Sequence, residues 1–356
     1  MMSTIIKRAK EGKFVLIAEM GVNYYDIAKK MNISVMDAAK LMVREAKDAG
    51  IHAVKFQTYK AETLAAKESP SYWDTSEEST TSQYELFKKF DSFSYEEYKE
   101  LCQYCDSLGI EFLSTAFDIE SADYLYELMN VYKISSSDLN NLPFVEYQAK
   151  KGKPILLSVG ASNEEEIDKT IQIIRKYNNE SIVLLHCVLE YPTPYEHANL
   201  NKIVSLKNKY PDLIIGYSDH TKPDDNADII KTAYNLGAIV VEKHYTLDKI
   251  LPGNDHYHAM DPQDAKNIIK DIEFIEEIRG SYEIKCLDTE IVARKNARRS
   301  LVATCDIKKG EKITENMLTF KRPGTGISPV DIMNVVGKTV VIDIEEDTII
   351  KYDMIE

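Results

Sequence analysis

The most constraining feature of this sequence is a repeated alternation of short apolar segments and amphipathic segments between residues 14 and 280. Segments with a helical repeat separate the apolar ones, and several begin with Ser, Asp or Asn and end in Gly or Asn. Segments that are apolar throughout are typical of strands buried on both faces, as in a parallel sheet covered by helices. The eight predicted strands are FVLIAE (14–19), HAVKFQ (52–57), EFLSTAF (111–117), VYKISSS (131–137), PILLSVG (154–160), IVLLHC (182–187), LIIGYSD (213–219) and AIVVEKH (238–244).

Eight such units favour a (β/α)₈ TIM barrel, an α/β fold of roughly 250 residues. An open doubly wound sheet is the alternative, but no G-x-G-x-x-G turn or P-loop follows any predicted strand. We predict a barrel domain over residues 1–285, a linker over 286–297 and a small β-rich domain over 298–356, where Gly-containing turns replace amphipathic helices. A Ser-, Thr- and Glu-rich insertion over 61–98 is expected to cover the barrel mouth.

Composition excludes several classes of protein. The chain has 44% hydrophobic residues and a net charge of −14, which indicates a globular protein that binds neither nucleic acid nor an anionic membrane. Five cysteines, an odd and sparse number, argue against a disulfide framework. Cys102 and Cys105 form a C-x-x-C within a helical pattern, and no second pair completes a zinc site. The amino terminus lacks the apolar segment of a signal peptide, so we expect a cytoplasmic protein.

Polar residues end every predicted strand. In a barrel enzyme the active site lies at the carboxyl ends of the strands, so these residues are candidates for its chemistry. Any one of them alone is readily explained as a cap or a buried polar group with a partner, but the recurrence at eight strands favours a site. They are Glu19, Lys55, Gln57, Thr58, Thr115, Asp118, Lys133, Ser136, Asp138, Ser158, His186, Ser218, Asp219, His220, Glu242 and His244.

Two histidines and three cations stand out in this set and in the small domain. His220 and His244 end neighbouring strands, so their imidazoles can bind one Mn²⁺, Zn²⁺ or Fe²⁺ ion and leave positions for water and substrate. Two hydrogen-bonded core histidines are the alternative. Lys55, Lys133 and Arg322 can neutralise a phosphate and a carboxylate, with Ser and Thr hydroxyls as further donors.

Ten segments together resemble the sialic acid synthase family in order and spacing, over nearly the whole chain. They are AEMGVNYYD, AVKFQTYK, LSTAFD, KISSSDLNNLP, LLHCVLEYPTPY, IGYSDHT, VVEKHYTLD, LPGNDHYHAMDP, RRSLVA and KRPGTGISP. The resemblance implies a barrel joined to an antifreeze-like (β-clip, SAF) domain in a domain-swapped homodimer. It also implies an enzyme that condenses phosphoenolpyruvate with an N-acetylated amino sugar, giving a nine-carbon 3-deoxy-2-keto acid and phosphate through C–O cleavage.

The resemblance also implies roles for individual residues. The implied metal ligands are His220 and His244, with Mn²⁺ preferred over Mg²⁺ or another divalent cation. Arg322 matches an arginine that reaches the partner subunit's site and contacts the N-acetyl group of the sugar. The implied catalytic residues are Glu19, Lys55, Lys133, Asp138 and Glu242. The implied substrate-binding residues are Gln57, Thr115, Ser136, Ser158, Tyr191, Ser218, Asp255 and Arg322.

Three segments depart from the family pattern, and they concern the acceptor sugar. The chain has GVNYYD at 21–26 where many members read G-x-N-H-N-G, HCVLEY at 186–191 for H-C-T-N/S-x-Y, and DHYHA at 255–259 for D-H-x-x-S. N-acetylmannosamine and the 2,4-diacetamido-trideoxyhexoses that lead to legionaminic or pseudaminic acid all remain open as acceptors. Two other functions also remain: a metal-dependent pyruvate aldolase acting on an amino sugar, with a Schiff-base variant at Lys55 or Lys133, and a carbohydrate-binding protein without turnover.

Overall fold

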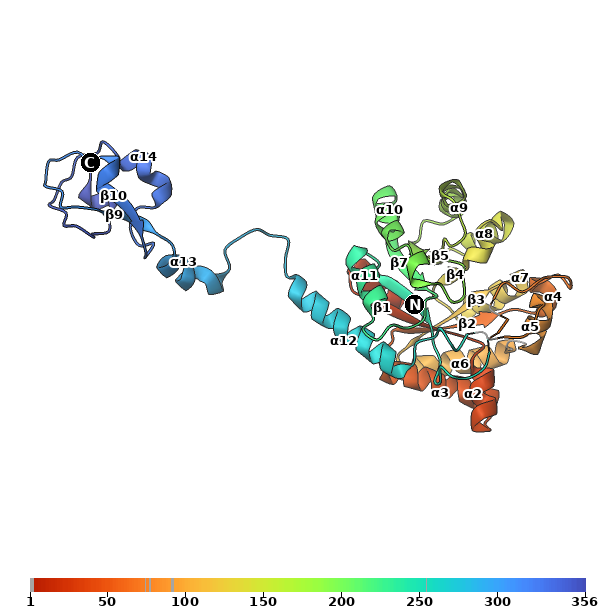
Figure 1. Cartoon of the computed structure of the whole chain (residues 1–356). Helices are drawn as coiled ribbons and strands as arrows, with labels where there is room; N and C mark the ends of the chain where they lie inside the picture. The colour runs from red at the N-terminus through yellow and green to blue at the C-terminus, as the bar shows by residue number, and fades with distance from the viewer. Residues whose placement is uncertain (1–2, 74, 77, 91–92, 254) are drawn as a thin grey trace. The chain divides into compact units, whose positions relative to one another are not determined.

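The chain folds into two compact units that divide between Arg279 and Gly280 (Figure 1). The computed structural model describes residues 3–73, 75–76, 78–90, 93–253 and 255–356. The division falls a few residues before the predicted end of the barrel domain at 285, and the predicted linker contains helix α13 (Ile291–Ala297).

The first unit is a closed barrel of parallel strands in the order β1 to β8, which confirms the predicted fold class. The fourth strand is shorter than predicted because its serine-rich end turns into a 3₁₀ helix, where the Asp138 N–H donates to the Ser135 carbonyl (3.1 Å). The strands are β1 (Val15–Gly21), β2 (Ala53–Thr58), β3 (Glu111–Ala116), β4 (Tyr132–Ile134), β5 (Ile155–Ser158), β6 (Ile182–His186), β7 (Ile214–Asp219) and β8 (Val240–His244).

Helices follow the strands and surround them, as the sequence pattern predicts. The capping signals are used: the Ser94 and Asn163 side chains each take part in a capping box at the start of a helix, and Gly109 ends a helix with φ of 66°. The helices of this unit are α1 (Thr4–Lys10), α2 (Tyr24–Met31), α3 (Val35–Asp48), α4 (Ala61–Leu64), α5 (Gln83–Lys89), α6 (Tyr95–Leu108), α7 (Ile119–Tyr124), α8 (Leu142–Ala149), α9 (Glu164–Tyr177), α10 (Asn201–Lys209), α11 (Asp228–Leu236) and α12 (Pro262–Arg279).

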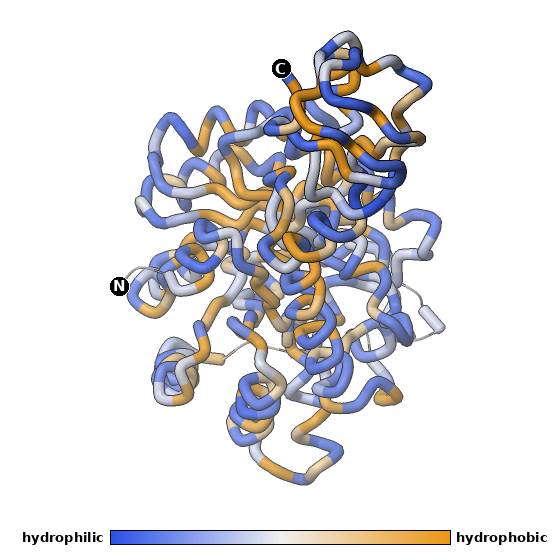
Figure 2. Tube along the Cα trace, turned by 90° about the vertical axis from the view of Figure 1, so that its left-hand side faces the viewer, coloured by the Kyte–Doolittle hydropathy of each residue, from blue (hydrophilic) through white to orange (hydrophobic). Residues whose placement is uncertain are grey.

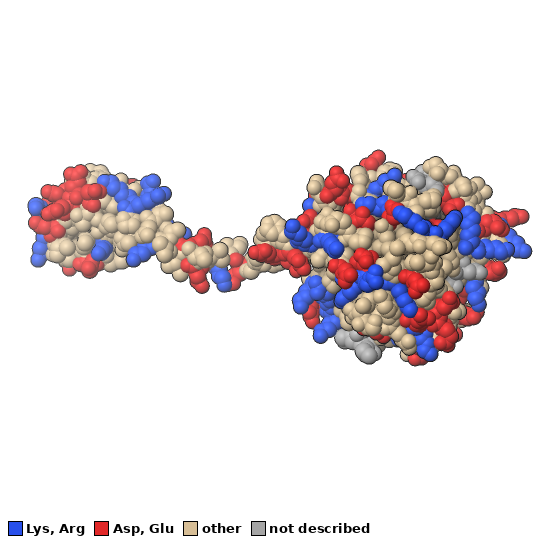
Figure 3. All heavy atoms as spheres, turned by 90° about the horizontal axis from the view of Figure 1, so that it is seen from below, with Lys and Arg blue, Asp and Glu red and all other residues tan. Residues whose placement is uncertain are grey.

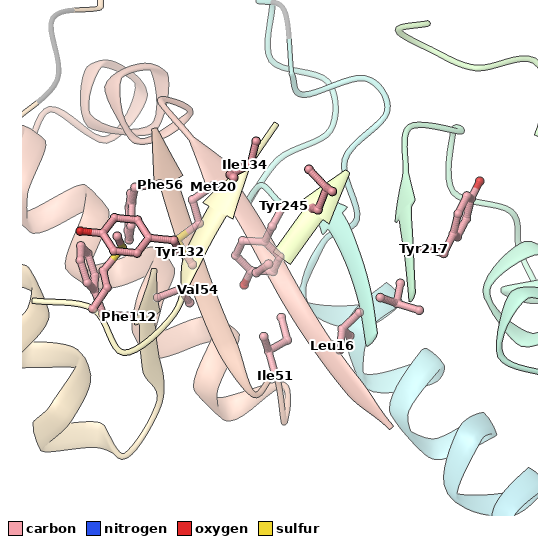
Figure 4. Close-up of a cluster of buried hydrophobic side chains, with 14 of the residues drawn as sticks. Leu16, Met20, Ile51, Val54, Phe56, Phe112, Tyr132, Ile134, Tyr217 and Tyr245 are labelled. Atoms are coloured by element: carbon pink, nitrogen blue, oxygen red, sulfur yellow. The ribbon is translucent and has the colours of Figure 1, made fainter. Parts of the chain in front are cut away.

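Alternate residues of each strand belong to two separate hydrophobic clusters. Leu16, Met20 and Phe56 lie in the outer cluster, between the strands and the helices (Figure 4), and the hydrophobic segments in Figure 2 likewise run through the interior of this unit. Ile17 and Leu185 belong to the inner cluster, onto which helix α1 packs. Because side chains alternate along a strand, the inward residues that follow this apolar layer are the polar ones at the carboxyl ends.

Gly216 shows how tightly the inside of the barrel is packed. A Cβ atom at this position of β7 would lie 2.4 Å from Leu185 Cδ2 and 2.4 Å from the Val240 carbonyl oxygen. The inner layer therefore closes the barrel below its polar end rather than leaving a pore.

The second unit is small and β-rich, as predicted. It contains α13, the antiparallel pair β9 (Ser300–Ala303) and β10 (Leu318–Lys321), and α14 (Ile332–Val335). Its own core includes Leu301, Ile307 and Ile344.

Among the described residues, the helices are too short or too polar to cross a membrane. Acidic and basic side chains are intermixed on the face of each unit that Figure 3 shows.

Candidate functional site

A cavity of about 310 Å³ opens at the carboxyl ends of the barrel strands. It collects all of the site residues expected from the sequence except Asp255, which lies beside it, and Arg322, which belongs to the second unit. The expected residues that line the cavity are Glu19, Lys55, Gln57, Thr115, Lys133, Ser136, Asp138, Ser158, Tyr191, Ser218, His220, Glu242 and His244.

Strand register brings two buried lysines and two buried carboxylates together on the cavity floor. Glu19 pairs in register with Lys55 of β2, and their side chains form an ion pair. Glu242 Oε1 lies 3.8 Å from Lys55 Nζ and 3.5 Å from Lys133 Nζ, so one carboxylate serves both lysines. Each of these side chains is at most 6% exposed, so the charges compensate one another with little help from water.

The pKa values of this charge cluster, formed by Glu19, Lys55, Lys133 and Glu242, follow from burial and pairing. Burial raises the pKa of Glu19 more than Lys55 lowers it, and burial lowers the pKa of Lys133 more than Glu242 raises it. For Lys55, burial lowers the pKa but Glu19 and Glu242 together raise it above its usual value. Burial raises the pKa of Glu242, yet Lys133 and Lys55 together hold it below its ordinary value.

Hydroxyl and amide groups surround the charge cluster. Lys55 Nζ donates to Thr115 Oγ1 (3.0 Å), Gln57 Nε2 donates to Glu19 Oε1 (2.8 Å), and Ser218 Oγ donates to Glu242 Oε1 (3.1 Å). Ser158 Oγ is buried and has no hydrogen-bond partner among the described residues. Cations beside unused hydroxyl donors form a site suited to a phosphate or carboxylate group.

Asp138 and Tyr191 lie on the cavity wall. Ser135 Oγ donates to Asp138 Oδ2 (3.3 Å), and burial raises the pKa of Asp138. The Tyr191 ring packs against His220, with ring centroids 4.2 Å apart, and burial raises its phenol pKa well above the usual value.

The two histidines expected to bind a metal both line the cavity. Their ring centroids are 5.6 Å apart, and burial lowers the pKa of His220 to about 4 and that of His244 well below the ordinary value, so both imidazoles are neutral. His220 Nδ1 hydrogen-bonds the Val188 carbonyl (2.7 Å), whereas His244 Nδ1 is buried without a hydrogen-bond partner among the described residues. Neutral imidazoles and an orphaned ring nitrogen fit a divalent transition-metal ion.

Asp255 lies beside His244 on the loop after β8. Its Oδ2 is 3.7 Å from His244 Nδ1, and burial, with Glu19 nearby, raises its pKa to about 7. The segment that replaces the family's G-x-N-H-N-G pattern holds this loop: Asn23 Nδ2 donates to the Tyr245 carbonyl (3.0 Å), and Asp26 Oδ2 lies 3.3 Å from His256 Nε2.

Some lining residues were not identified from the sequence. Leu64, Tyr72, Gln83 and Phe87 come from the 61–98 insertion, which was predicted as a cover without named residues. No motif marks them, because their position depends on how the insertion folds back over the barrel. In the sequence His258 stands out only as a departure from the family pattern, yet in the structure it offers a ring nitrogen close to His244 and Asp255.

Arg322 lies in the second unit, at an exposed position just after β10. Its expected role on a partner subunit's site stays a prediction.

Comparison with known proteins follows the same division into two units. The family described as NeuB family matches residues 42–284, and the SAF domain matches residues 298–356. The N,N'-diacetyllegionaminic acid synthases of Legionella pneumophila and Campylobacter jejuni are each 37% identical to this chain. The alignments cover 96% of this chain and 94% of the Legionella protein, and 95% of this chain and 99% of the Campylobacter protein.

A solved structure agrees with these matches. The N-acetylneuraminic acid (sialic acid) synthetase from Leptospira borgpetersenii superposes with a TM-score of 0.68 and 30% sequence identity, over 79% of this chain and 90% of that chain. With the matched barrel, the matched SAF domain and relatives aligned along nearly their whole length, the chain belongs to the NeuB family of sialic acid synthases and carries a C-terminal SAF domain.

Proposed function

We propose that this protein is a nonulosonic acid synthase that condenses phosphoenolpyruvate with the open-chain aldehyde of an N-acetylated amino hexose. The observation that carries the proposal is the buried charge cluster of Lys55 and Lys133 with Glu19 and Glu242, ringed by hydroxyl donors in the cavity. Its relatives are named as synthases of legionaminic, pseudaminic and N-acetylneuraminic acids, which supports this reaction class.

In the proposed reaction C3 of phosphoenolpyruvate attacks the aldehyde carbon, forming the new C–C bond while the aldehyde oxygen takes up a proton. Positive charge then develops at C2, where Glu19 and Asp138 provide stabilising carboxylates. Water adds at C2 and loses one proton, which offsets the proton taken up by the aldehyde oxygen. The C2–O bond to phosphate then breaks, and the remaining hydroxyl proton leaves with the inorganic phosphate, so that C2 becomes the ketone. Lys55 and Lys133, with the hydroxyls, hold the phosphate group throughout and fix the reacting carbon in place.

The residues present fit a divalent cation, with Mn²⁺ as the expected ion, because the buried imidazoles of His220, just after β7, and of His244, at the end of β8, line the cavity. His220 and His244 are the ligands expected from the sequence. When bound, such an ion supplies Lewis-acid stabilisation of negative charge on the acceptor oxygen.

The decisive experiment is phosphate release from phosphoenolpyruvate with a panel of acceptors that includes N-acetylmannosamine and 2,4-diacetamido-trideoxyhexoses. In H₂¹⁸O, C–O cleavage places the label on C2 of the product and leaves it out of the phosphate. Phosphate that carries ¹⁸O, or product formed from pyruvate without phosphate release, would overturn the proposal.

Ser158→Ala tests the assigned binding role, with Ser114→Ala as its control. Ser158 Oγ has no hydrogen-bond partner in the part of the chain that the structure describes, whereas Ser114 Oγ lies 2.6 Å from Thr58 Oγ1 on the neighbouring strand and is not among the residues that line the cavity. A hydrogen bond to a charged group contributes about 1.5–3 kcal/mol, so Ser158→Ala is expected to raise KM for phosphoenolpyruvate by roughly tenfold to a hundredfold. Equal effects of the two variants would contradict the role of Ser158.

A lysine with a lowered pKa also permits Schiff-base chemistry, which is the second candidate function. Burial lowers the pKa of Lys133, and the side chain lines the cavity. Borohydride treatment with pyruvate would trap a covalent adduct on Lys133 if the protein were a Schiff-base aldolase. The synthase proposal expects no adduct.

The proposed assembly is a domain-swapped homodimer in which Arg322 serves the partner subunit's site. Mixing Arg322→Ala chains with Lys133→Met chains tests this, because one intact site forms in the mixed dimer only if the arginine acts across the interface. Failure to recover activity in the mixture would overturn the role of Arg322.

A further inference from the structure

His258 is a buried histidine in the loop after β8. Its side chain is 0% exposed, and neither Nδ1 nor Nε2 has a hydrogen-bond partner among the described residues. Burying two unpaired polar atoms is unfavourable, and native proteins normally give such atoms a partner. The same loop shows the contrast: His256 Nδ1 lies 2.7 Å from Thr246 Oγ1, and its Nε2 lies 3.3 Å from Asp26 Oδ2.

Two further side chains of types that can bind a metal ion lie close to His258. Its Nε2 lies 3.9 Å from Asp255 Oδ1, while the other oxygen of that carboxylate lies 3.7 Å from His244 Nδ1. The rings of His244 and His258 have centroids 4.6 Å apart. One ligand atom from each of the three residues lies within 4.8 Å of the other two, and no such group of described residues includes His220.

These separations suit a single ion. With metal–ligand bonds of about 2.0–2.2 Å, two ligand atoms on one ion lie roughly 3 to 4.4 Å apart, depending on the angle between the bonds. The separations of 3.7 Å from His244 Nδ1 to Asp255 Oδ2 and of 3.9 Å from His258 Nε2 to Asp255 Oδ1 fall within this span. The three ligand atoms lie within 4.8 Å of one another, slightly wider than this span, so the side chains must draw together to bind the same ion.

The backbone fixes His258 in this position. The loop after β8 folds back on the strand end, so that the Met260 N–H donates to the His244 carbonyl (2.8 Å) and the Thr246 N–H donates to the Met260 carbonyl (3.0 Å). His258 therefore stands two residues from a backbone contact with His244, the strand-end residue on which the cluster is built.

We infer that His258, together with His244 and Asp255, holds the divalent ion of this cavity. His258 thus adds an imidazole to the pair expected from the sequence, His220 and His244. The inference deepens the proposed function, on which it rests only for the presence of a divalent ion in this cavity. Two imidazoles and a carboxylate select Mn²⁺, Fe²⁺, Co²⁺ or Zn²⁺ over Mg²⁺, which prefers oxygen ligands.

The test measures Mn²⁺ alone, without substrates, on the full chain. His258→Gln is expected to weaken Mn²⁺ binding by at least about tenfold, since even outer partners of a metal site contribute tenfold to a hundredfold. His186→Gln is the matched control, because His186 is equally buried in β6 but has its Nε2 bonded to the Ala198 carbonyl (2.8 Å) and does not line the cavity. The control is expected to bind Mn²⁺ as the unchanged protein does.

Pulsed electron paramagnetic resonance of bound Mn²⁺ counts the coordinated imidazole nitrogens, which a purely structural role of His258 would not alter. The expected result is the loss of one nitrogen coupling in His258→Gln. If affinity and nitrogen count are both unchanged in that variant, or depend on His220 alone, the inference is wrong. Thermal unfolding checks that the variants fold, and His258→Asn serves as a second variant. If neither variant folds, the nitrogen count of the unchanged protein is compared with that of His220→Gln, and this comparison decides whether His258 is a ligand.

The outcome is separable from that of the proposed function. Mn²⁺ binding that depends on His258, in a protein that releases no phosphate from phosphoenolpyruvate, would refute the synthase proposal and leave this inference standing. Phosphate release, with Mn²⁺ binding that does not depend on His258, would refute this inference and leave the synthase proposal standing.

Discussion

Glu242→Gln is the substitution that most directly tests the buried charge cluster. The carboxylate lies 3.5 Å from Lys133 Nζ and 3.8 Å from Lys55 Nζ, and glutamine keeps its shape while removing its charge. At an effective dielectric constant of about 20, each contact is worth roughly 4 to 5 kcal/mol of attraction. The variant also avoids the several kcal/mol needed to bury a carboxylate, which offsets part of this lost attraction. The free energy of unfolding is therefore expected to fall by about 3–5 kcal/mol, as when a buried ion pair is broken.

The same substitution changes how the site responds to anions. Glu19, Glu242, Lys55 and Lys133 sum to zero charge, and removal of Glu242 leaves an excess cation on the cavity floor. Inorganic phosphate should therefore bind the variant at least about tenfold more tightly, a gain of about 1.4 kcal/mol, and should restore part of the lost stability.

Urea unfolding with a chelator present, at several phosphate concentrations, measures both effects. The single tryptophan, Trp73, lies in the barrel unit, so its fluorescence together with circular dichroism follows that unit. Glu100→Gln is the control, since Glu100 is 54% exposed in its pair with Lys40 and should contribute about 0–1 kcal/mol. A loss below about 1 kcal/mol in Glu242→Gln, with unchanged phosphate affinity, would refute the electrostatic reading of the site.

Two further predictions concern pH and the shape of the cavity. Burial lowers the pKa of His52 to about 4. Between pH 6.5 and 4 the unfolded chain therefore takes up a proton that the folded chain does not. The free energy of unfolding should fall by about 2 to 3 kcal/mol as the pH falls through that range. His52→Asn keeps an acceptor for the Leu16 N–H, which donates to His52 Nδ1 (3.0 Å), and should flatten this part of the stability profile; an unchanged profile would contradict the assignment. Gly160→Ala would put a Cβ 2.7 Å from the buried Cys187 Sγ and 3.2 Å from Ser136 Oγ, so we expect a lower melting temperature together with weaker phosphate binding by calorimetry. Wild-type phosphate affinity in the folded variant would argue against a phosphate position beside Ser136.

The sequence by itself determined the barrel and the identity of most of its cavity lining. Apolar strands alternate with amphipathic helices, and both patterns depend on contacts that recur every few residues, so they can be read locally. The polar strand ends could be assigned to one site because the carboxyl ends of parallel strands meet at one end of a barrel. The sequence alone therefore predicts Glu19, Lys133 and His244 at the same end of the barrel.

Only the tertiary structure decided how these residues pair. Glu242 serves both Lys55 and Lys133, a sharing that follows from closure of the barrel and the register of β7, β8 and β1, which no local pattern encodes. The insertion over 61–98 reaches the cavity, and the loop after β8 returns to place His258 against His244, through contacts between residues far apart or irregular in sequence. Barrel closure and loop packing leave no periodic pattern in the sequence, because each depends on one set of contacts between distant residues that does not repeat along the chain.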